Sequence, residues 1–498
     1  MRQKRCNCIM PGSIRMVVLH GKAGLACLLL LVLSGLVTAC QTIEATGERQ
    51  LSLIGEQQEV SIGRESDKDI VKTMGLYEDE NLQEYIQQLG GKIAATTERP
   101  DLPWTFRVVD DDAVNAFALP GGYIYLTRGI LAHFENQAQL AGVLGHEIAH
   151  VTAKHSVVRM SKAMVTQLGL GVAMVVVPEL QELAPLASQG MQLLFLKFSR
   201  DDETESDMLG VRYMRNVNED PRELIEVMEM LGRISEAREE GMVPEWASTH
   251  PYPENRIQDI AARIDELETQ DYRPVERESY LQRLDTMVYG KDPRQGIVRE
   301  SMFYHPDMEF AYAFPDGWKI VNQRSAVVGV SPAKDAVIQM SVVTADSPQQ
   351  ALQTLFRQEG VQGRNARKVT IHGNPAATGV FLAQTQQGTI QGRATFIRYG
   401  DRLFQIVGYC SEKSWGEYAR LIERSMFSFD RLTDSRLLNV QPLRIDIVRV
   451  GSRTTLQELH ERRGVPIPVE ELARLNQLEA GATLERGQLV KMVEGELP

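Results

Sequence analysis

The chain is poor in cysteine. It has five among 498 residues, and four of these lie in its first forty positions. Three of the four fall within a leader segment described below and the fourth stands at its end, so Cys410 is the one thiol left in the body of the protein. A single thiol forms no intramolecular disulfide, and stability is therefore expected to come from core packing. With 43% hydrophobic residues, the chain is long enough for two or three such cores.

Excess positive charge is also missing. The formal net charge is −12 at pH 7. Residues 1–39 hold five Lys and Arg and no Asp or Glu, so the chain without them would carry −17. Because binding to nucleic acid relies on Lys and Arg that neutralise phosphates, this balance argues against nucleic acid as a partner.

No hydrophobic run is long enough for a clear membrane span. The run 23–37 is short for a bilayer crossing and follows a basic leader, which is typical of a secretory signal over residues 1–39. It ends in Leu-Val-Thr-Ala-Cys, which resembles a bacterial lipobox, so we expect acylation of Cys40. The alternative is a single-span anchor. The residue after the acylated cysteine is Gln41. By similarity to the sorting of enterobacterial lipoproteins, this residue favours a lipid anchor in the outer membrane, with the protein in the periplasm of a Gram-negative bacterium.

The other long apolar stretch is broken. Residues 166–177 are interrupted by Gln167 and followed by Pro178, which predicts a buried helix hairpin and not a span. A 34-residue period, which would indicate tetratricopeptide repeats, is absent as well.

One dense motif stands out against these absences. Residues 146–150 read His-Glu-Ile-Ala-His, the H-E-x-x-H pattern. They lie in a segment, 137–154, whose apolar residues recur at three- and four-residue spacing, which predicts a buried helix. Histidines four apart share one helix face, so His146 and His150 can bind one metal ion, and Glu147 can take a proton from a water beside it. The alternative is a helix with two partly exposed histidines and an ordinary glutamate.

A catalytic zinc site needs a third protein ligand. The best candidates lie in the acidic segment 198–207, where Glu203 and Asp207 are four residues apart and share a helix face. One would bind the metal, and the other would anchor a ligand imidazole from behind. The alternative is a solvated acidic helix start.

These motifs resemble those of the zinc metallopeptidases typified by the HtpX heat-shock protease and the CAAX prenyl protease. The resemblance covers about residues 50–265 and rests on four ordered segments: 115–129, 146–150, 198–207, and 248–251 with Arg256 beyond it. The lack of further membrane-length runs is similar to the soluble periplasmic branch of this family, which includes the β-barrel-assembly-enhancing protease.

The resemblance implies a mainly helical, zincin-like peptidase domain of the gluzincin type with a small edge sheet. It implies one Zn²⁺ per chain on His146, His150 and Glu203, with Glu147 as general base and Asp207 in a supporting role.

Two further histidines belong to this pattern. By resemblance, His250 approaches the metal, either to stabilise the oxyanion or to cap the zinc in a resting state. The alternative is a loop histidine that packs beside Pro251. His155 lies off the face that His146 and His150 share, so it is not expected to be a ligand.

The segment 121–126 predicts a strand of the small sheet. It opens with two glycines, which let a substrate backbone approach closely. An edge strand pairs with an extended peptide, so the expected substrate-binding residues are Asn115, Gly121, Gly122 and Tyr123. The alternative is an interior strand of the same sheet.

We expect six segments along the chain. They are the signal peptide 1–39, a lipidated tether 40–55, the peptidase domain 56–265, a linker 266–298, an α+β domain 299–431 and a small β-α-α-β domain 432–498.

The two C-terminal domains are read from their patterns. Strand patterns at 326–330, 337–343 and 394–399 and helix patterns at 347–358 and 415–428 predict the α+β domain, which resembles the PsbP/Mog1 type. The last domain resembles a LysM domain, which binds peptidoglycan glycans. The alternative is a lid or spacer with the same topology.

The expected function is that of a zinc metalloendopeptidase of the bacterial cell envelope. Its expected substrates are misfolded or unassembled envelope proteins, by resemblance. The rival is a non-catalytic periplasmic chaperone or scaffold lipoprotein tethered to the cell wall. Glu147 separates the two, because a scaffold has no physical need for a base beside the metal.

Overall fold

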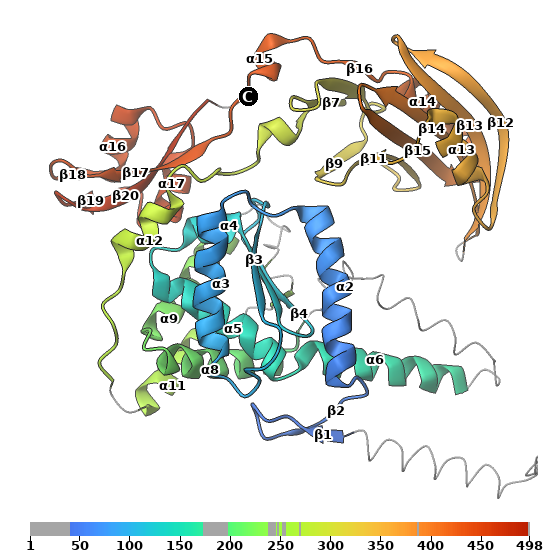
Figure 1. The fold of residues 1–498 in the computed structure, drawn as a ribbon. Coiled ribbons are helices and arrows are strands. Elements are labelled where there is room, and N and C mark those ends of the chain that lie inside the picture. The colour runs from blue at the N-terminus through green and yellow to red at the C-terminus, as the bar shows by residue number, and fades with distance from the viewer. Residues whose placement is uncertain are drawn as a thin grey trace, which may run out of the picture.

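The computed structural model describes residues 40–172, 198–237, 246, 249–250, 255–267, 270–385 and 388–496. Figure 1 shows a multidomain protein with a helix-rich N-terminal region and a sheet-rich C-terminal region. The predicted signal segment and residues 173–177 of the predicted helix hairpin lie outside the described residues. Among those described, no helix combines the length and the apolar character that a bilayer crossing requires.

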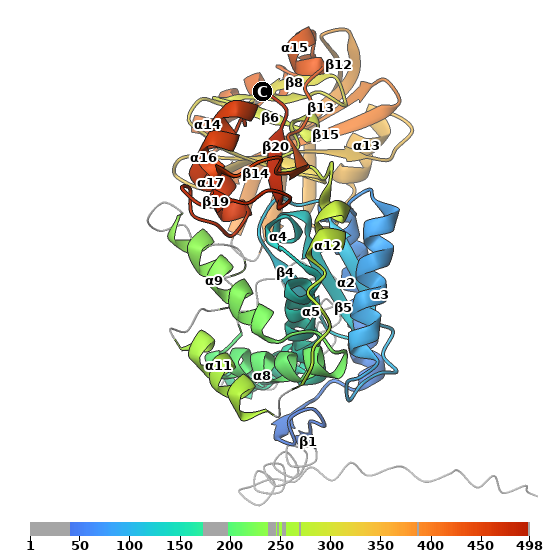
Figure 2. The ribbon, with the colours of Figure 1, turned by 90° about the vertical axis from the view of Figure 1, so that its left-hand side faces the viewer.

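Helices surround a small sheet in the N-terminal region. The helices are α2 (Glu56–Met74), α3 (Glu80–Ala94), α4 (Arg128–His133), α5 (Gln137–Thr152), α6 (His155–Val172), α8 (Arg200–Asn216), α9 (Arg222–Glu236) and α11 (Arg256–Glu266). The strands are β1 (Cys40–Thr42) and β2 (Arg49–Leu51), which form a hairpin, and β3 (Thr105–Val109), β4 (Ala116–Leu119) and β5 (Tyr123–Thr127). Helix α5 runs through the interior with α3, α8, α9 and β4 packed on it (Figure 2).

The predicted edge strand is in fact the central one. The sheet order is β3-β5-β4, and β5 pairs in parallel with β3 and antiparallel with β4. Its backbone groups are therefore used on both sides, so the prediction of an edge strand at 121–126 was wrong and the interior alternative is correct. The outer strands of the sheet are β3 and β4, and no strand of the described residues pairs with the outer side of β4.

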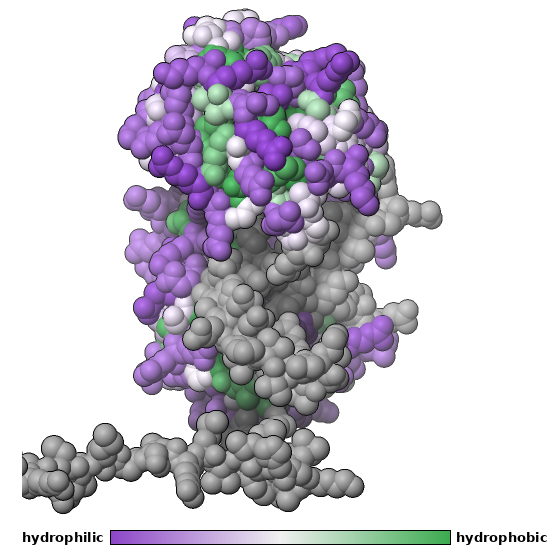
Figure 3. Space-filling view, turned by 90° about the vertical axis from the view of Figure 1, so that its right-hand side faces the viewer, coloured by the Kyte–Doolittle hydropathy of each residue, from purple (hydrophilic) through white to green (hydrophobic). Residues whose placement is uncertain are grey.

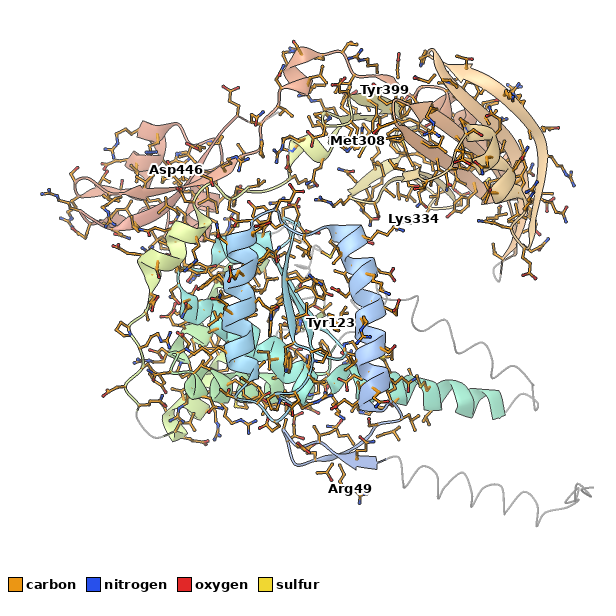
Figure 4. The ribbon with its side chains drawn as sticks, viewed as in Figure 1. Arg49, Tyr123, Met308, Lys334, Tyr399 and Asp446 are labelled. Atoms are coloured by element: carbon orange, nitrogen blue, oxygen red, sulfur yellow. The ribbon has the colours of Figure 1, made fainter. Side chains whose placement is uncertain are left out.

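Of the two glycines before β5, Gly121 packs against helix α2 and Gly122 packs against Trp104. Gly121 and Gly122 have φ values of +81° and +94°. A Cβ on Gly121 would lie 2.6 Å from the Cα of Val60 in α2. Tyr123 is only 7% exposed, and its ring lies so close to Gly63 that a Cβ there would meet it at 2.7 Å. Figure 4 shows Tyr123 between the small sheet and α2, so the close approach is made by the chain's own helix.

Two antiparallel sheets form the region after residue 296. One has the order β16-β8-β7-β6 and the other the order β12-β13-β14-β15-β11-β10-β9. The strands are β6 (Ile297–Arg299), β7 (Met302–His305), β8 (Phe310–Ala313), β9 (Lys319–Gln323), β10 (Ala326–Val330), β11 (Ala336–Val343), β12 (Val361–Ile371), β13 (Asn374–Thr385), β14 (Gly388–Tyr399), β15 (Arg402–Ser411) and β16 (Asp430–Arg431).

Two helices cover these sheets. They are α13 (Pro348–Phe356) and α14 (Trp415–Met426), and side chains of α14, β8, β11 and β15 share one core. The predicted strands at 326–330, 337–343 and 394–399 are confirmed, as are the helices predicted at 347–358 and 415–428. On the face shown in Figure 3, hydrophobic residues of this region lie between polar ones.

The last segment has the predicted order of strand, two helices and strand. Its elements are β17 (Arg444–Arg449), β18 (Thr454–Thr455), α16 (Leu456–Arg463), α17 (Val469–Leu475), β19 (Thr483–Leu484) and β20 (Leu489–Glu494). β17 pairs with β20 and β18 with β19, both antiparallel. The short elements α12 (Arg277–Leu284), η2 (Pro293–Gln295) and α15 (Ser435–Leu438) lie in the connections.

This last segment shares a hydrophobic core with the N-terminal region. Leu472 and Val490 belong to the same buried cluster as Leu131 and Phe134 near the start of α5. The predicted linker also contributes to this cluster through Leu281 of α12. The N-terminal region, α12 and the last segment are therefore held together by one contiguous core.

A buried lysine fastens the last segment to the start of α5. Lys491 of β20 has no exposed surface, and its Nζ donates to the carbonyl oxygens of Ala132 (2.9 Å) and Phe134 (3.0 Å). The same Nζ is 2.8 Å from a carboxylate oxygen of Glu135. Glu135 also pairs with Arg277 of α12. A buried ion pair of this kind is costly to break, because the remaining partner stays charged and dry.

Replacing Lys491 with Met should lower the free energy of unfolding by about 3 kcal/mol, because two carbonyls and Glu135 lose their buried cation. Urea unfolding of the full chain measures the change. Lys319→Met, at an exposed position of β9, is the matched control and should change stability by less than about 0.5 kcal/mol. Equal stability of Lys491→Met and wild type would show that the buried contacts contribute nothing.

A neighbouring histidine should make stability depend on pH. His133 donates from Nδ1 to the carbonyl of Gly129 (2.8 Å), and its own carbonyl accepts from Gln477. Burial, with a smaller effect of Lys491 and Arg474, lowers the pKa of His133 to about 4. The folded pKa lies below the unfolded value of about 6.5, so this contribution is present above pH 6.5 and is lost as pH falls towards 4.

The His133→Asn variant keeps a donor for Gly129 but does not titrate. Its free energy of unfolding should therefore fall less than that of the wild type between pH 6.5 and pH 4. Urea unfolding at a series of pH values measures both slopes. Identical slopes would mean that His133 titrates normally in the folded protein.

Candidate metal centre

Two histidines of α5 face each other in the interior. The helix begins after Asn136, whose side chain accepts a hydrogen bond from the amide of Gln139. His146 and His150 lie one turn apart on one face, and both are buried. Their Nε2 atoms are 3.1 Å apart, with the rings at 79° to each other. Two ring nitrogens so close together can bind the same ion.

Helix α8 crosses α5 closely enough to bring a carboxylate to these nitrogens. At the crossing, a Cβ on Gly145 would lie 3.3 Å from the carbonyl oxygen of Gly210, and a Cβ on Gly210 would lie 3.3 Å from the amide of His146. Larger side chains at either position would push the helices apart. The oxygens of Glu203 reach within 3.5 Å of Nε2 of His150 and 3.6 Å of Nε2 of His146.

A third histidine completes the group. Nδ1 of His250 is 3.0 Å from Oε1 of Glu203 and 3.4 Å from Nε2 of His146. Its ring stacks on Trp246, with centroids 4.9 Å apart and planes at 15°. One ligand atom from each of His146, His150, Glu203 and His250 lies within 4.8 Å of the others, and all four side chains are buried.

Asp207 and Arg256 support this group from behind. Nδ1 of His146 donates to Asp207 (2.9 Å), and Arg256 donates to the same carboxylate through two bonds of 2.7 Å. Nη1 of Arg256 is also 3.0 Å from Glu203. Burial raises the pKa of Asp207, but Arg256 and His146 outweigh it and hold the pKa below its usual value. The ionised Asp207 keeps the proton of His146 on Nδ1 and leaves Nε2 free for a metal.

Glu147 lies beside the group without hydrogen bonds of its own. Both its carboxylate oxygens are buried and accept no hydrogen bond from the described residues. Nε2 of His250 is 3.6 Å from its Oε1. Burial raises the pKa of Glu147 above its usual value, despite the opposing effect of His250 and His146. A carboxylate with a raised pKa is suited to accept and return a proton.

The donor atoms fit Zn²⁺. Zinc prefers imidazole nitrogen and carboxylate oxygen in a tetrahedral arrangement, in which two ligand atoms at about 2.05 Å from the ion are about 3.3 Å apart. The 3.1 Å between the Nε2 atoms of His146 and His150 agrees with this spacing. Burial and the neighbouring imidazoles lower the pKa of His150 well below its usual value, so the ring is neutral, as a ligand must be.

The structure thus brings together six residues singled out from the sequence. His146, His150, Glu203 and His250 form the cluster, with Glu147 beside it, and Asp207 lies behind His146. Of the residues expected to bind substrate, Gly121, Gly122 and Tyr123 lie at the turn packed on α2. Asn115 precedes β4, and its Oδ1 is buried without a hydrogen-bond partner among the described residues.

Three contributions could not be read from the motifs. Gly210 allows the helices to cross, Arg256 bridges two carboxylates, and His155 lies against His150 with a 2.9 Å contact between Nδ1 atoms. Arg256 and His155 belonged to the recognised pattern without these roles, and the glycines at 145 and 210 lie on the two helices that carry the ligands.

Comparisons with known proteins agree with this chemistry. Residues 80–264 match peptidase family M48. The chain is 28% identical to the beta-barrel assembly-enhancing protease of Escherichia coli over 237 residues, 46% of this chain and 48% of that protein. It is 32% identical to the mitochondrial metalloendopeptidase OMA1 of Arabidopsis thaliana over 186 residues, 37% of this chain and 36% of that protein. The chain therefore spans about half or less of the length of these relatives.

Solved structures add little to this. The cyanobacterial PsbP of Synechocystis covers 27% of this chain and 95% of its own length, with a TM-score of 0.23 and 14% identity. A likeness at this level assigns neither a fold nor a role.

Replacing Arg256 with Leu should destabilise the metal-free protein by about 3–5 kcal/mol, because Asp207 and Glu203 would remain buried without their cation. Arg256→Lys should recover part of the loss, since lysine keeps the charge but lacks the two-pronged geometry. Urea unfolding in a chelator measures both. Arg263→Leu, on a more exposed part of α11, is the control. An Arg256→Leu variant as stable as wild type would contradict the bridging role.

Proposed function

The chain belongs to peptidase family M48 through residues 80–264, and from this premise we propose that it is a zinc-dependent endopeptidase of the bacterial cell envelope. The observation that carries the proposal is the buried carboxylate of Glu147, which accepts no hydrogen bond from the described residues, beside the cluster of His146, His150 and Glu203. Burying a carboxylate without hydrogen bonds costs stability, so a catalytic use explains it better than a structural one.

Each residue has a distinct task in this proposal. His146, His150 and Glu203 hold the ion, and Asp207 fixes the tautomer of His146. When bound, zinc supplies a Lewis acid that polarises the scissile carbonyl and acidifies water. Glu147 takes the proton of the attacking water and returns it to the leaving amine.

His250 is proposed to cap the metal in a resting state. Its place in the four-residue cluster supports capping over a loop histidine packed beside Pro251. Burial lowers the pKa of His250, but Glu203 and Glu147 outweigh it and raise the pKa above its usual value. Movement of this side chain away from the cluster would open a position for water, after which it could serve the oxyanion instead.

Substrates are proposed to be misfolded or unassembled envelope proteins. The support is similarity to a protease whose name refers to β-barrel assembly. An extended substrate can pair with the free edge of β4, with Asn115 at its start as a binding residue. Gly121, Gly122 and Tyr123 would then act indirectly, by holding the sheet against α2.

The location follows from the N-terminal sequence. We propose removal of residues 1–39, acylation of Cys40, a tether over 40–55 and anchoring to the outer membrane from the periplasmic side.

Three further segments follow in this proposal. The zincin-like peptidase domain spans 56–265 and is followed by the connecting segment 266–298. The α+β domain 299–431 would position the protein or its substrate.

The domain 432–498 is proposed to be LysM-like, supported by its strand–helix–helix–strand order. A role in binding peptidoglycan is one use of that topology. The other use is as a structural part of the peptidase. The buried contacts of Lys491 with the residues before α5 support this second use.

The alternative remains a non-catalytic chaperone or scaffold of the periplasm. It does not account for Glu147, because the cluster would hold its ion equally well with an uncharged residue at that position.

The Glu147→Gln variant tests the proposal. It should bind zinc and unfold like the wild type, but kcat/KM on casein should fall by at least about 10²–10⁴-fold, since a general base contributes on that order. Zinc content by mass spectrometry and casein cleavage measure the two properties. Glu359→Gln, an exposed substitution after α13, is the control. Undiminished cleavage by Glu147→Gln, or full activity of a zinc-free His146→Ala variant, would refute the proposed reaction.

A further inference from the structure

A break between two helices brings His155 back to the metal centre. Helix α5 ends at Thr152 and α6 begins at His155, with Lys154 between them at a φ of +57°. In an unbroken helix, residue 155 would be rotated by about 140° from residue 150 and could not touch it. The left-handed turn instead places Nδ1 of His155 2.9 Å from Nδ1 of His150.

A carboxylate of α8 holds the other side of the same ring. Nε2 of His155 is 2.9 Å from Oε2 of Glu205, and His155 itself is buried. Glu205 lies between Glu203 and Asp207 in sequence, and its side chain keeps 25% of its surface exposed. Helix α8 therefore brings three carboxylates to three histidines of one centre. Glu203 contacts His250, Asp207 contacts His146 and Glu205 contacts His155.

The hydrogen positions along this chain of contacts follow from the metal. If Nε2 of His150 binds the ion, the proton of the neutral ring sits on Nδ1 and is donated to His155. Nδ1 of His155 must then be the acceptor, so its own proton sits on Nε2 and is donated to Glu205. No other assignment of neutral rings satisfies both 2.9 Å contacts with the metal bound at Nε2.

We propose that His155 and Glu205 are positioning residues that fix the tautomer and ring orientation of His150 for metal binding. This rests on the proposed function, because it presumes that His150 binds zinc. Asp207 does the same for His146 directly, whereas His150 is reached through an intervening imidazole. Partners behind a metal ligand commonly change metal affinity by about 10–100-fold.

A simpler reading is that His155 only fills space behind His150. The two readings differ in what a replacement must keep. Asn at position 155 offers an acceptor oxygen near the place of Nδ1, whereas Leu fills a similar volume without an acceptor. A positioning role therefore predicts that the two variants differ in zinc affinity, and a packing role predicts that they do not.

The experiment measures the zinc dissociation constant of the full chain by competition with a chromophoric chelator. His155→Leu should raise it about 10–100-fold, and His155→Asn should recover most of the affinity. Glu205→Leu should weaken binding as well, because Nε2–H of His155 then loses its 2.9 Å acceptor and keeps only the more distant carboxylate of Asp202, 3.9 Å away. Urea unfolding of the metal-free proteins separates these effects from lost stability.

Two controls accompany these variants. His460→Leu removes a hydrogen-bonded histidine of the last segment, whose Nε2 lies 2.7 Å from the carbonyl oxygen of Ile467, and should leave zinc affinity unchanged. His146→Ala should abolish tight binding. If the wild type binds no zinc, or His146→Ala binds it equally well, the proposed function itself fails.

The inference about His155 has its own failing outcomes. If wild type and His146→Ala behave as expected but His155→Leu binds zinc like wild type, His155 does not position the ligand. Equal losses in His155→Leu and His155→Asn would overturn the acceptor role.

The turn offers an independent test. Lys154→Gly should keep the affinity, whereas Lys154→Val should weaken it, because a β-branched residue is strained at positive φ and would displace His155. Equal affinity of these two variants would overturn the part played by the turn.

Discussion

The arrangement of charge in a dry interior is the constraint on which the structure depends. Glu203 and Asp207 are buried carboxylates on one face of α8, and each alone would be expensive to bury. Arg256 lies between them and offsets that cost with two hydrogen bonds to Asp207 and an ion pair with Glu203. Because the guanidinium comes from α11 and the histidines from α5, three helices are fixed relative to one another by a single set of charges.

The same logic extends to the far end of the chain. Lys491 enters the N-terminal region as a buried cation and meets the carbonyls that precede α5. The metal-binding helix is thus held at its start by the last strand and at its middle by α8. A segment that the sequence pattern separates from the N-terminal region proves to share its core, so the metal-binding region and the C-terminal segment are not independent modules.

The sequence was most informative where one element carries its own signal. The helix over 137–154 was predicted from the three- and four-residue spacing of its apolar side chains, although the structure buries nearly every residue of α5, and the strand over 326–330 was predicted from its run of valines. Strand β12 gave no such signal, since almost all of its residues are exposed on both faces. The position of β5 within its sheet was predicted wrongly for a related reason. The periodicity of a sequence indicates which residues are buried, but it does not indicate which strands lie on either side. The contacts of Arg256 depend on helices distant in sequence, which no local pattern encodes.

The attachment of β20 to α5 has a consequence for how the protein matures. Residues 132–135 are synthesised more than three hundred positions before Lys491, whose side chain completes their hydrogen bonds. Until the last strand has formed, the loop in front of the metal-binding helix lacks its buried cation. Formation of the candidate metal centre is thereby tied to the arrival of residue 491, and a chain that ended before β20 would hold the cluster on an incomplete support.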